Sequence, residues 1–425
     1  MRSDNDGKAK SILRFVEEVH GTRHVPREML FDFLEQAMAM AARKNGDGYD
    51  DSLVEVHINR NTGEINAYRD GVPLTPEEIT ERAGAQTAKQ IFIQKIRDAE
   101  RDMNFDKFYP RIGTLVNGTV SRGGDRNKVV SVALEDGGVD AIMPHSERIP
   151  REKFQTGDKI TALIVDVKKN GAVVKVILSR SRPLLVQRIF EQEIPEIVDG
   201  TICIKNVSRD AGRRTKVAVY SDDPRIDLVG ACVGVRGARS SAINKKLGGG
   251  ERVDVVPYSE EPTEFIRSAL KPAEIEEIIL CEKIGRAIVL VQPECRAVAI
   301  GNHGQNVRLA SRLTNWDIDV MTREDLDKMI EKATEDFLSI EGITAELANV
   351  LVGQGYLSYS DLSIIEPEDL VALGRLSEEQ VNYIVQVADE RAEEEENARE
   401  NNMTLLNLQR HEQREEENKG DGDVE

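Results

Sequence analysis

Two short stretches of the sequence contain the residue types and spacing that could hold a phosphate backbone. CVGVRGARSS carries Gly234 and Gly237, and AIGNHGQNVR carries Gly301 and Gly304, so the glycine pair recurs 67 positions later (234 to 301). A glycine lacks a Cβ, so its backbone can approach a sugar-phosphate chain closely and adopt dihedral angles that other residues avoid. A helix that begins directly after such a turn directs its N-terminal N–H groups and the positive end of its dipole at phosphate.

The elements around the two glycine pairs are expected to repeat as well. Two alternating strands and a helix precede each pair, and a helix and a strand follow it; TICIKNVS, TKVAVYS and RVDVVPY are the strands around the first pair. A lone Gly-x-x-Gly is more often a plain turn. Two copies in the same order of elements indicate tandem KH modules, each of which holds about four unpaired bases in a shallow groove.

Both the backbone and the side chains of the two loops are expected to contact RNA. Arginine can contact phosphate, and an amide or imidazole can contact phosphate or base edges. For His303 the alternative is an exposed turn residue with no special role. The residues expected to bind single-stranded RNA are Gly234, Val235, Arg236, Gly237 and Arg239 in the first copy and Gly301, Asn302, His303, Gly304, Asn306 and Arg308 in the second.

The charge of the chain is unevenly distributed. The formal net charge is −19, yet residues 1–330 hold 51 acidic and 50 basic residues, whereas residues 331–425 hold 25 acidic and 7 basic residues. The acidity therefore belongs to the C-terminal region. The rest of the chain can carry the basic faces that RNA binding requires.

The sequence contains no segment typical of a membrane or secreted protein. No run of about 18 apolar residues occurs, and the N-terminal MRSDNDGKAK lacks an apolar signal core, so we expect a cytoplasmic protein without membrane contact. Four scattered cysteines form no CxxC pair and predict reduced core residues instead of a metal site. Nucleotide-binding, zinc-protease, hydrolase and calcium-loop motifs are absent in their required contexts, so neither catalytic residues nor a cofactor are expected.

Residues 1–108 are expected to form an N-terminal α/β domain. The apolar spacing of SILRFVEEVH and REMLFDFLEQAMAMAARK predicts two helices within 9–44, separated by GTRHVP. LVEVHINRNTGEINAYR alternates on both sides of NRNTG and predicts a hairpin. TPEEITERAGAQTAKQIFIQKIRDAERDMN predicts a long, charged amphipathic helix that starts at its Thr-Pro-Glu-Glu segment.

Residues 109–182 contain five short alternating segments separated by Gly, Asn and Asp. Five strands within about 70 residues predict a small closed barrel of the OB type, with a small β-sandwich as the alternative. Gly118 in the first strand favours the barrel, because a glycine permits the sharp coiling that closure needs. The pattern alone does not decide whether such a barrel binds nucleic acid or protein.

The region 331–388 contains two related helix-hairpin-helix signatures, IEGITAELANVLVGQGY and ALGRLSEEQVNYI. Such turns often bind DNA phosphate, but this region holds 11 acidic and 2 basic residues, so protein binding is favoured. Residues 389–425 hold 14 acidic and 5 basic residues and predict a disordered acidic tail. We hypothesise from this charge distribution that the acidic C-terminal region competes with RNA for basic faces of the KH domains.

The sequences around the glycine loops resemble a known family. RIDLVGACVGVRGARSSAINKKLGGGERVDVVPY and AIGNHGQNVRLASRLTNWDIDVMT are similar to the tandem KH region of the NusA family of bacterial transcription factors. QTAKQIFIQKIRDAERDM resembles the helix that joins that family's N-terminal domain to its barrel. The resemblance implies a multidomain α+β protein with these parts: an N-terminal polymerase-binding α/β domain at 1–108, a five-stranded OB-fold S-one RNA-binding barrel at 109–182, two tandem type II KH domains at 183–272 and 273–330, a helix-hairpin-helix acidic repeat at 331–388 and a disordered acidic tail at 389–425.

By this resemblance the protein is expected to be a monomeric elongation factor that binds RNA polymerase, single-stranded nascent RNA and other elongation or antitermination factors. It would modulate pausing, termination and antitermination. Two features depart from the family: the connection between NAYRD and QTAKQ is short, which could alter the polymerase contact, and only one acidic repeat is present. The alternative is an RNA-binding regulator or ribosome-associated protein that uses the same modules without polymerase.

Overall fold

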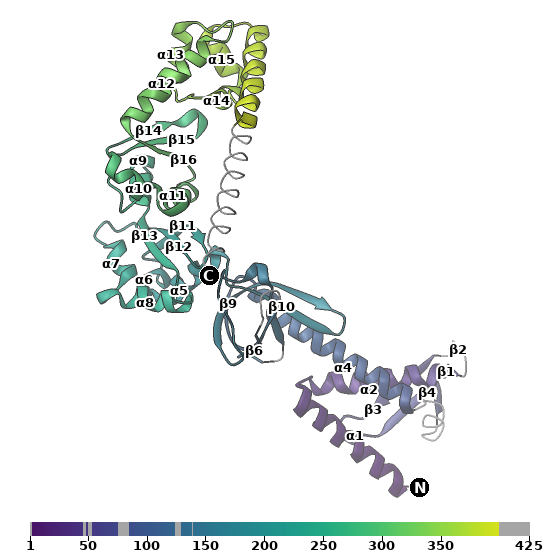
Figure 1. The fold of residues 1–425 in the computed structure, drawn as a ribbon. Helices are drawn as coiled ribbons and strands as arrows, with labels where there is room; N and C mark the ends of the chain where they lie inside the picture. The colour runs from purple at the N-terminus through teal and green to yellow at the C-terminus, as the bar shows by residue number, and fades with distance from the viewer. Residues whose placement is uncertain are drawn as a thin grey trace, which may run out of the picture. The chain divides into compact units, whose positions relative to one another are not determined.

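The structure is a computed structural model that describes residues 2–45, 48–49, 53–74, 85–123, 129–137 and 139–398. It confirms a multidomain α+β protein whose sheets are separate from one another (Figure 1). The chain divides into two compact units. The first comprises Met1–Pro195, Ala211–Arg213 and Arg239–Arg252, and the second comprises Glu196–Asp210, Arg214–Ala238 and Val253–Glu425.

The N-terminal domain packs two helices against a three-stranded antiparallel sheet. The sequence pattern predicted both helices and the hairpin, and it missed the short third strand, which adds only three residues to the sheet edge. Strand β3 buries Val54, Val56 and Ile58 in the domain core and exposes the residues between them, as its alternation predicts. The elements are α1 (Arg2–Arg23), α2 (Arg27–Arg43), β1 (Lys44–Asn45), β2 (Gly48–Tyr49), β3 (Val54–Ile58), β4 (Ile65–Arg69) and β5 (Val72–Leu74).

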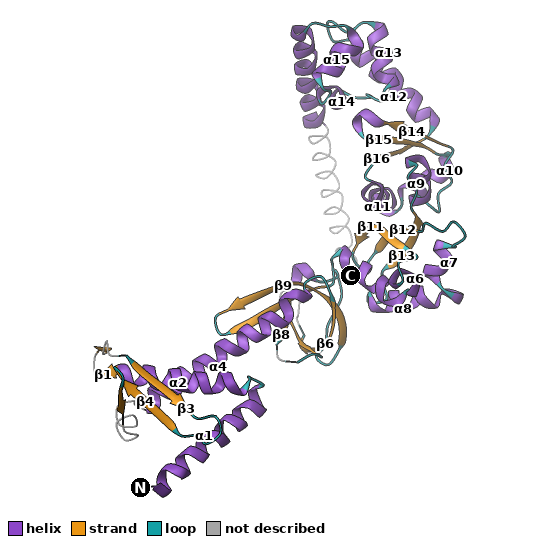
Figure 2. Cartoon of the chain, turned by 180° about the vertical axis from the view of Figure 1, so that it is seen from behind, coloured by secondary structure: helices purple, strands orange, loops and turns teal. Residues whose placement is uncertain are grey.

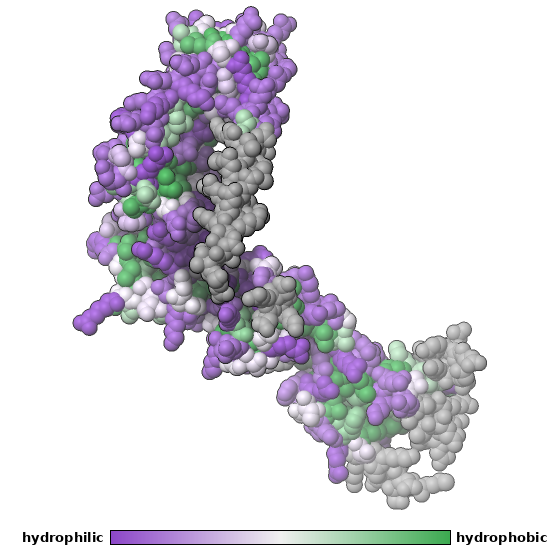
Figure 3. Space-filling view, viewed as in Figure 1, coloured by the Kyte–Doolittle hydropathy of each residue, from purple (hydrophilic) through white to green (hydrophobic). Residues whose placement is uncertain are grey.

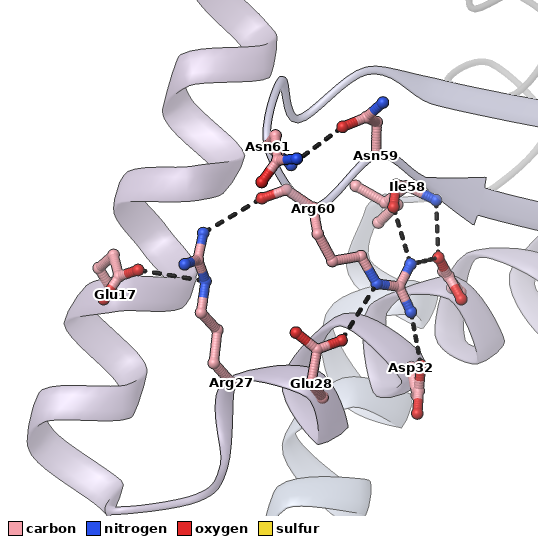
Figure 4. A network of polar contacts seen from close by, with 9 residues as sticks. Glu17, Arg27, Glu28, Asp32, Ile58, Asn59, Arg60 and Asn61 are labelled. Carbon is pink, nitrogen blue, oxygen red and sulfur yellow. Dashed lines mark hydrogen bonds and ion pairs between the residues drawn. The ribbon is translucent and has the colours of Figure 1, made fainter.

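Arg60, in the turn between β3 and β4, fastens the hairpin to α2. Its guanidinium donates to Asp32 at 2.7 Å, lies 3.5 Å from Glu28 and also contacts Glu35 (Figure 4). Glu35 accepts a hydrogen bond from the backbone N–H of Ile58 at 2.7 Å, so one carboxylate holds both the strand end and the arginine. The hydrogen bond to Glu35 and the surrounding carboxylates raise the pKa of Arg60. The hairpin is therefore held in one orientation on the helix.

Helix α4 (Ala85–Phe108) belongs to two hydrophobic cores. It packs Phe92, Ile96 and Ala99 into the core of the N-terminal domain, and its last residue, Phe108, is fully buried in the core of the barrel. Figures 1 and 2 both show the helix running from the N-terminal domain to the barrel. The predicted start of this helix, at 75–78, lies outside the described residues.

Five strands close into a barrel in the order β10-β8-β7-β6-β9, which confirms the OB-type prediction. A Cβ at Gly118 would lie 2.6 Å from Cγ1 of Val132 and 2.8 Å from the carbonyl oxygen of Ala133, so the close approach of the first two strands requires glycine. The elements are η1 (Tyr109–Arg111), β6 (Leu115–Arg122), β7 (Val130–Leu134), β8 (Asp140–Met143), η2 (His145–Glu147), β9 (Lys159–Asn170) and β10 (Val173–Ser179), where η denotes a 3₁₀ helix.

Both KH domains show the predicted order of elements. Helices α5 (Pro183–Glu193) and α6 (Pro195–Val198) precede the first. It comprises β11 (Cys203–Asp210), β12 (Arg214–Tyr220), α7 (Leu228–Val233), η3 (Val235–Gly237), α8 (Ala238–Lys246) and β13 (Arg252–Pro257). After α9 (Pro262–Ala269), the second comprises β14 (Glu277–Cys281), η4 (Glu282–Ile284), β15 (Arg286–Leu290), α10 (Pro293–Ile300), η5 (Asn302–Gly304), α11 (Gln305–Thr314) and β16 (Asp317–Met321).

The sheet of the first KH domain and the second KH domain share one hydrophobic core. Ala218 of β12 and Val256 of β13 belong to the same buried cluster as residues of α9, α11 and β15. Asn206 of β11 also donates to the carbonyl oxygen of Leu313 at 2.9 Å, near the end of α11. The two sheets are therefore linked by packing as well as by the chain.

The acidic C-terminal domain packs on the second KH domain. Its elements are α12 (Arg323–Leu338), α13 (Ala345–Gly353), α14 (Tyr359–Ser363), α15 (Pro367–Gly374) and a further helix over 378–398. Ala287 and Val289 of β15 point into the KH core, whereas Ile288 and Leu290 on the other face of the strand join the core of the helical domain. Both faces of β15 are thus buried, and the two helical hairpins predicted from the sequence are confirmed.

An ion pair reinforces this packing. Arg286 of β15 donates two hydrogen bonds to Asp361 of α14, at 2.8 and 2.7 Å, and Lys283 lies 2.9 Å from Asp369. Burial works to raise the pKa of Asp361, but the hydrogen bonds from Arg286 and from the N–H of Leu357 outweigh it and hold the pKa below its ordinary value. No local pattern predicted this ion pair, because its partners lie 75 positions apart in the chain.

The described surface is mainly hydrophilic in the view of Figure 3, with scattered apolar residues. None of the helices in the described ranges is long and apolar enough to cross a membrane. Of the cysteines predicted to lie in cores, Cys232 and Cys281 are buried and Cys203 and Cys295 are partly exposed; none of these four described residues forms a disulfide. Burial raises the pKa of the Cys281 thiol.

Candidate nucleic-acid interface

The two glycine loops follow the same backbone path. Gly234 has φ 74° and ψ 172°, and Gly301 has φ 75° and ψ 174°, a region that is essentially restricted to glycine. The third loop residue is left-handed in both copies, with φ 53° for Arg236 and φ 51° for His303. In both loops the N–H of the second glycine donates to the carbonyl oxygen of the first at 3.1 Å. The repeat seen in the sequence is therefore a repeat of conformation.

The side chains at the loop tips are exposed. Val235 is 84% exposed, and Arg236, Asn302 and His303 are exposed as well. Within the described ranges, these four side chains form no hydrogen bond or ion pair with the protein. They are therefore available to a ligand at the place where the sequence predicted contact with RNA.

Asn306 occupies a different position from the one expected of an RNA contact. It is completely buried, and its amide donates to the carbonyl oxygens of Leu270 at 3.1 Å and Ala299 at 3.0 Å. A Cβ at Gly301 would lie 2.8 Å from Cβ of Asn306 and 2.9 Å from its backbone nitrogen. Asn306 therefore packs beneath the second loop, and its side chain does not reach the surface where RNA would lie.

Arg308 and Gln305 at the start of α11 contact Asp210 at the end of β11. Gln305 donates to Asp210 at 2.6 Å, and Arg308, whose side chain is 49% exposed, lies 3.8 Å from the same carboxylate. Sequence reasoning predicted Arg308 and missed Asp210, which lies 95 positions from Gln305. Arg239 of the first copy stands at the position of Asn306, five residues after the first glycine of its loop, and is half-buried in α8.

The N-terminus of α11 lacks the side-chain cap that three later helices, α12, α13 and α14, have. Thr322, Thr344 and Ser358 each accept a hydrogen bond from the first turn of α12, α13 or α14, whereas Gly304 at the N-cap of α11 has no side chain to do so. No side chain therefore caps the N-terminus of α11. Among the residues that the structure describes, no three His, Cys, Asp or Glu side chains gather as a metal site would require.

Three parts of the chain match known family descriptions: the NusA N-terminal domain at residues 11–80, the NusA-like first KH domain at 180–258 and the NusA-like second KH domain at 262–328. The transcription termination/antitermination protein NusA of Rickettsia conorii is 33% identical over 410 residues, covering 87% of this chain and 79% of that protein. The chain belongs to the NusA family.

A second NusA relative, the protein of the same name from Rickettsia prowazekii, is 33% identical over 407 residues, with the same coverage of 87% and 79%. The two matched NusA KH domains contain the Gly234 and Gly301 loops, so the family match and the loop geometry agree on the same segments. The crystal structure of APE1850 is 22% identical to the chain, with a TM-score of 0.27, and the likeness covers 33% of this chain and 97% of that one. At that TM-score it carries no weight for the fold.

Proposed function

We propose that this protein is an RNA-binding transcription elongation factor that binds RNA polymerase and nascent RNA and modulates pausing, termination and antitermination. The proposed binding of RNA rests on one observation: the two glycine loops share the same backbone conformation and expose the side chains at their tips. We assign RNA contact to Gly234, Val235, Arg236 and Gly237 in the first loop and to Gly301, Asn302, His303 and Gly304 in the second. Arg239 and Arg308 flank these loops, and Asn306 supports the second one from below.

The N-terminal domain is the part we assign to RNA polymerase. It matches the NusA N-terminal domain, and the Arg60 contacts hold its hairpin on α2. Helix α4 shares a core with this domain and another with the barrel, so a polymerase-bound N-terminal domain would hold the barrel at a defined place. We further propose that the protein works in the cytoplasm as a monomer, without a catalytic role, and meets other elongation or antitermination factors there.

The acidic C-terminal domain is not free to cover the RNA-binding loops. Its core is continuous with β15, and the Arg286–Asp361 pair would have to break before the domain could leave. We therefore restrict the proposed competition with RNA to the acidic residues that follow this domain. Most of the predicted disordered tail, 399–425, lies outside the described residues.

The proposal is tested with the full chain and an Arg236→Asp/His303→Asp variant, because aspartate tolerates the left-handed conformation of both positions. The unchanged chain should bind single-stranded RNA, be retained on immobilised RNA polymerase and alter pause lifetimes in a transcription assay. The variant should lose RNA affinity by about 30-fold or more, since about 2 kcal/mol is expected for the lost contacts of Arg236 and His303 together with the repulsion of phosphate by two new carboxylates. It should keep its polymerase contact. RNA binding without retention of polymerase would favour the alternative RNA-binding regulator.

A further inference from the structure

The sheet of the second KH domain is buried on both faces. Its central strand, β15, lies between β14 and β16. On the outer face, four apolar side chains lie in the core of the acidic helical domain, and each is at most 6% exposed: Cys281, Ile288, Leu290 and Met321. Without this domain they would face water, and exposing that much apolar surface is unfavourable. The acidic domain therefore completes the outer face of the sheet.

The inner face of the same strand supports the second glycine loop. Ala287 and Val289 share a buried cluster with Ala299 of α10, the helix that leads into this loop. The carbonyl oxygen of Ala299 accepts a hydrogen bond at 3.0 Å from the amide of Asn306, which packs beneath the loop. A single strand thus separates the acidic domain from the residues that support the loop.

Two ion pairs tie the start of α12 to the second KH domain. Arg296 of α10 lies 3.0 Å from Asp325, and Arg323 donates to Glu277 of β14 at 2.6 Å. Asp325 also completes the N-terminal cap of α12 with Thr322. Each pair is partly exposed and worth little alone. Together they hold the first turn of the acidic domain against the helix that leads into the second loop.

Gly355 lies where the acidic domain approaches the sheet closely. A Cβ at this position would lie 2.6 Å from Cβ of Cys281 and closer still to its Sγ. Cys281 is 5% exposed, so its thiol is covered while the domain is docked. A substitution at Gly355 therefore pushes the domain away from the sheet, and the access of a thiol reagent to Cys281 reports its separation.

We propose that docking of the acidic domain on β15 and RNA binding at the second glycine loop strengthen each other. The inference rests on the proposed function and adds a control to it: a partner that withdraws the acidic domain releases RNA from the second loop, while the first loop keeps its affinity. The element with two states is the outer face of β15, which is either covered by the acidic domain or open to water. The coupling is reciprocal, because linked binding equilibria change each other by the same factor.

The first test uses full chains that carry Gly355→Ala. This change is combined either with Arg236→Asp, which leaves the second loop as the main RNA contact, or with His303→Asp, which leaves the first. The RNA is single-stranded and about 10 nucleotides long, enough for two KH domains at about four bases each. Gly355→Ala should weaken RNA binding by about 10-fold in the Arg236→Asp chain and by less than about 2-fold in the His303→Asp chain.

The matched control is Gly342→Ala in the same helical domain. Gly342 has φ 101° and Gly355 has φ 94°, so both substitutions strain the backbone in the same way. A Cβ at Gly342 would lie at an ordinary 3.7 Å from Cδ1 of Ile384. The control should leave RNA affinity unchanged in both chains. Equal weakening by the two alanine substitutions, or equal weakening by Gly355→Ala in both chains, overturns the inference.

The second test leaves the acidic domain unaltered, so it still decides the matter if Gly355→Ala fails to fold. In the Arg236→Asp chain, alkylation of Cys281 by iodoacetamide is followed by peptide mass spectrometry. The buried Cys232 of the first KH domain serves as the internal reference. Saturating RNA should slow the labelling of Cys281 by about 10-fold and leave that of Cys232 unchanged. Labelling of Cys281 that does not change while RNA is bound overturns the inference.

The same labelling shows whether the acidic domain separates from the sheet on its own. Without RNA, the free energy of opening derived from Cys281 labelling should be smaller than the free energy of unfolding of the KH core, measured in urea through Trp316. Equal values would mean that Cys281 is exposed only when the KH core unfolds. The domain would then have no separate open state, which also overturns the inference.

Failure of the proposed function gives a different result. If the Arg236→Asp/His303→Asp variant binds RNA as tightly as the unchanged chain, the loops do not hold RNA, and both the proposed function and the coupling are wrong. If that variant loses RNA binding while RNA does not alter Cys281 labelling in the Arg236→Asp chain, the proposed function stands and only the coupling is wrong.

Discussion

The two KH loops have the same backbone and different chemistry. Their glycines and left-handed third residues superimpose in φ and ψ, yet the first tip presents Val235 and Arg236 and the second presents Asn302 and His303. The glycine spacing therefore encodes a shape, and the intervening residues decide what that shape offers. We expect the first loop to act through permanent charge and the second mainly through hydrogen bonds.

The two KH domains also differ in what packs against their sheets. The sheet of the second domain is covered by the acidic helical domain, with Ile288 and Leu290 buried beside the Arg286–Asp361 pair. A domain that must stay rigid to hold RNA gains from such a cover, because the free energy needed for local opening rises with the apolar area buried. The difference implies that the second KH domain depends on residues beyond 330 for its stability.

The largest effect is expected from Asp361→Asn, which leaves Arg286 without its bidentate partner. Breaking a buried pair of this kind should lower the free energy of unfolding of the second KH domain by about 3 kcal/mol. Trp316, the only tryptophan, packs against the core shared by the KH domains and serves as the fluorescence probe in urea unfolding. The control is Asp223→Asn, which removes an exposed pair with Arg225 in the first domain and should change little. If the two variants lowered the free energy of unfolding equally, the second KH domain would not depend on the Arg286–Asp361 pair as we expect.

The pKa of Asp361 adds a pH dependence to this comparison. Because the folded-state pKa lies below the ordinary value of 3.8, the stability that Asp361 contributes is fully present above about pH 4 and is lost as the pH falls through the folded pKa. The difference in unfolding free energy between the unchanged chain and Asp361→Asn should thus be constant from neutral pH to about pH 4 and shrink below it. A difference that grew on acidification would contradict this assignment.

A smaller difference in stability is expected between alanine substitutions at the two glycines of the second loop. Gly301→Ala should cost about 2–3 kcal/mol of stability, because the new Cβ would meet Asn306 and the backbone would be strained. Gly304→Ala should cost only about 1 kcal/mol, since φ is 70° but no atom lies within 4 Å of the added Cβ. Urea unfolding followed through Trp316 measures both. Similar losses would mean that close packing under the loop matters less than its dihedral angles.

The smallest effect compares the loop tips directly. Arg236→Ala should weaken RNA binding by about 10-fold and lower the salt slope by about 0.7, as expected for one lost phosphate contact. His303→Ala should weaken binding by about 2-fold and leave the salt slope unchanged, because it removes no permanent charge. Titrations of single-stranded RNA at several salt concentrations make the comparison. A larger salt effect for His303→Ala than for Arg236→Ala would reverse the roles proposed here.

The local sequence determined most of the elements. Alternation predicted the five barrel strands, the glycine pairs predicted the two loops, and the charge split located the acidic region. These features depend on residues that are close together in the chain. The spacing of apolar side chains selects helix or strand, and glycine permits backbone angles that other residues avoid. Gly118 could be singled out from the sequence as a glycine within a strand, but the reason it must be glycine is the close approach of Val132 and Ala133 on the neighbouring strand.

Only the tertiary structure decided which side chains near the loops are exposed and which are buried. Asn306 was predicted to bind RNA, yet it is buried against Leu270 and Ala299, and the charge of Arg308 is shared with Asp210. The same holds for Arg286, whose partner Asp361 lies in another domain. A helix start can present a polar residue outward or inward with equal local propensity. The outcome depends on buried carbonyl and carboxylate groups supplied by distant segments, and those partners come together only when the chain is folded.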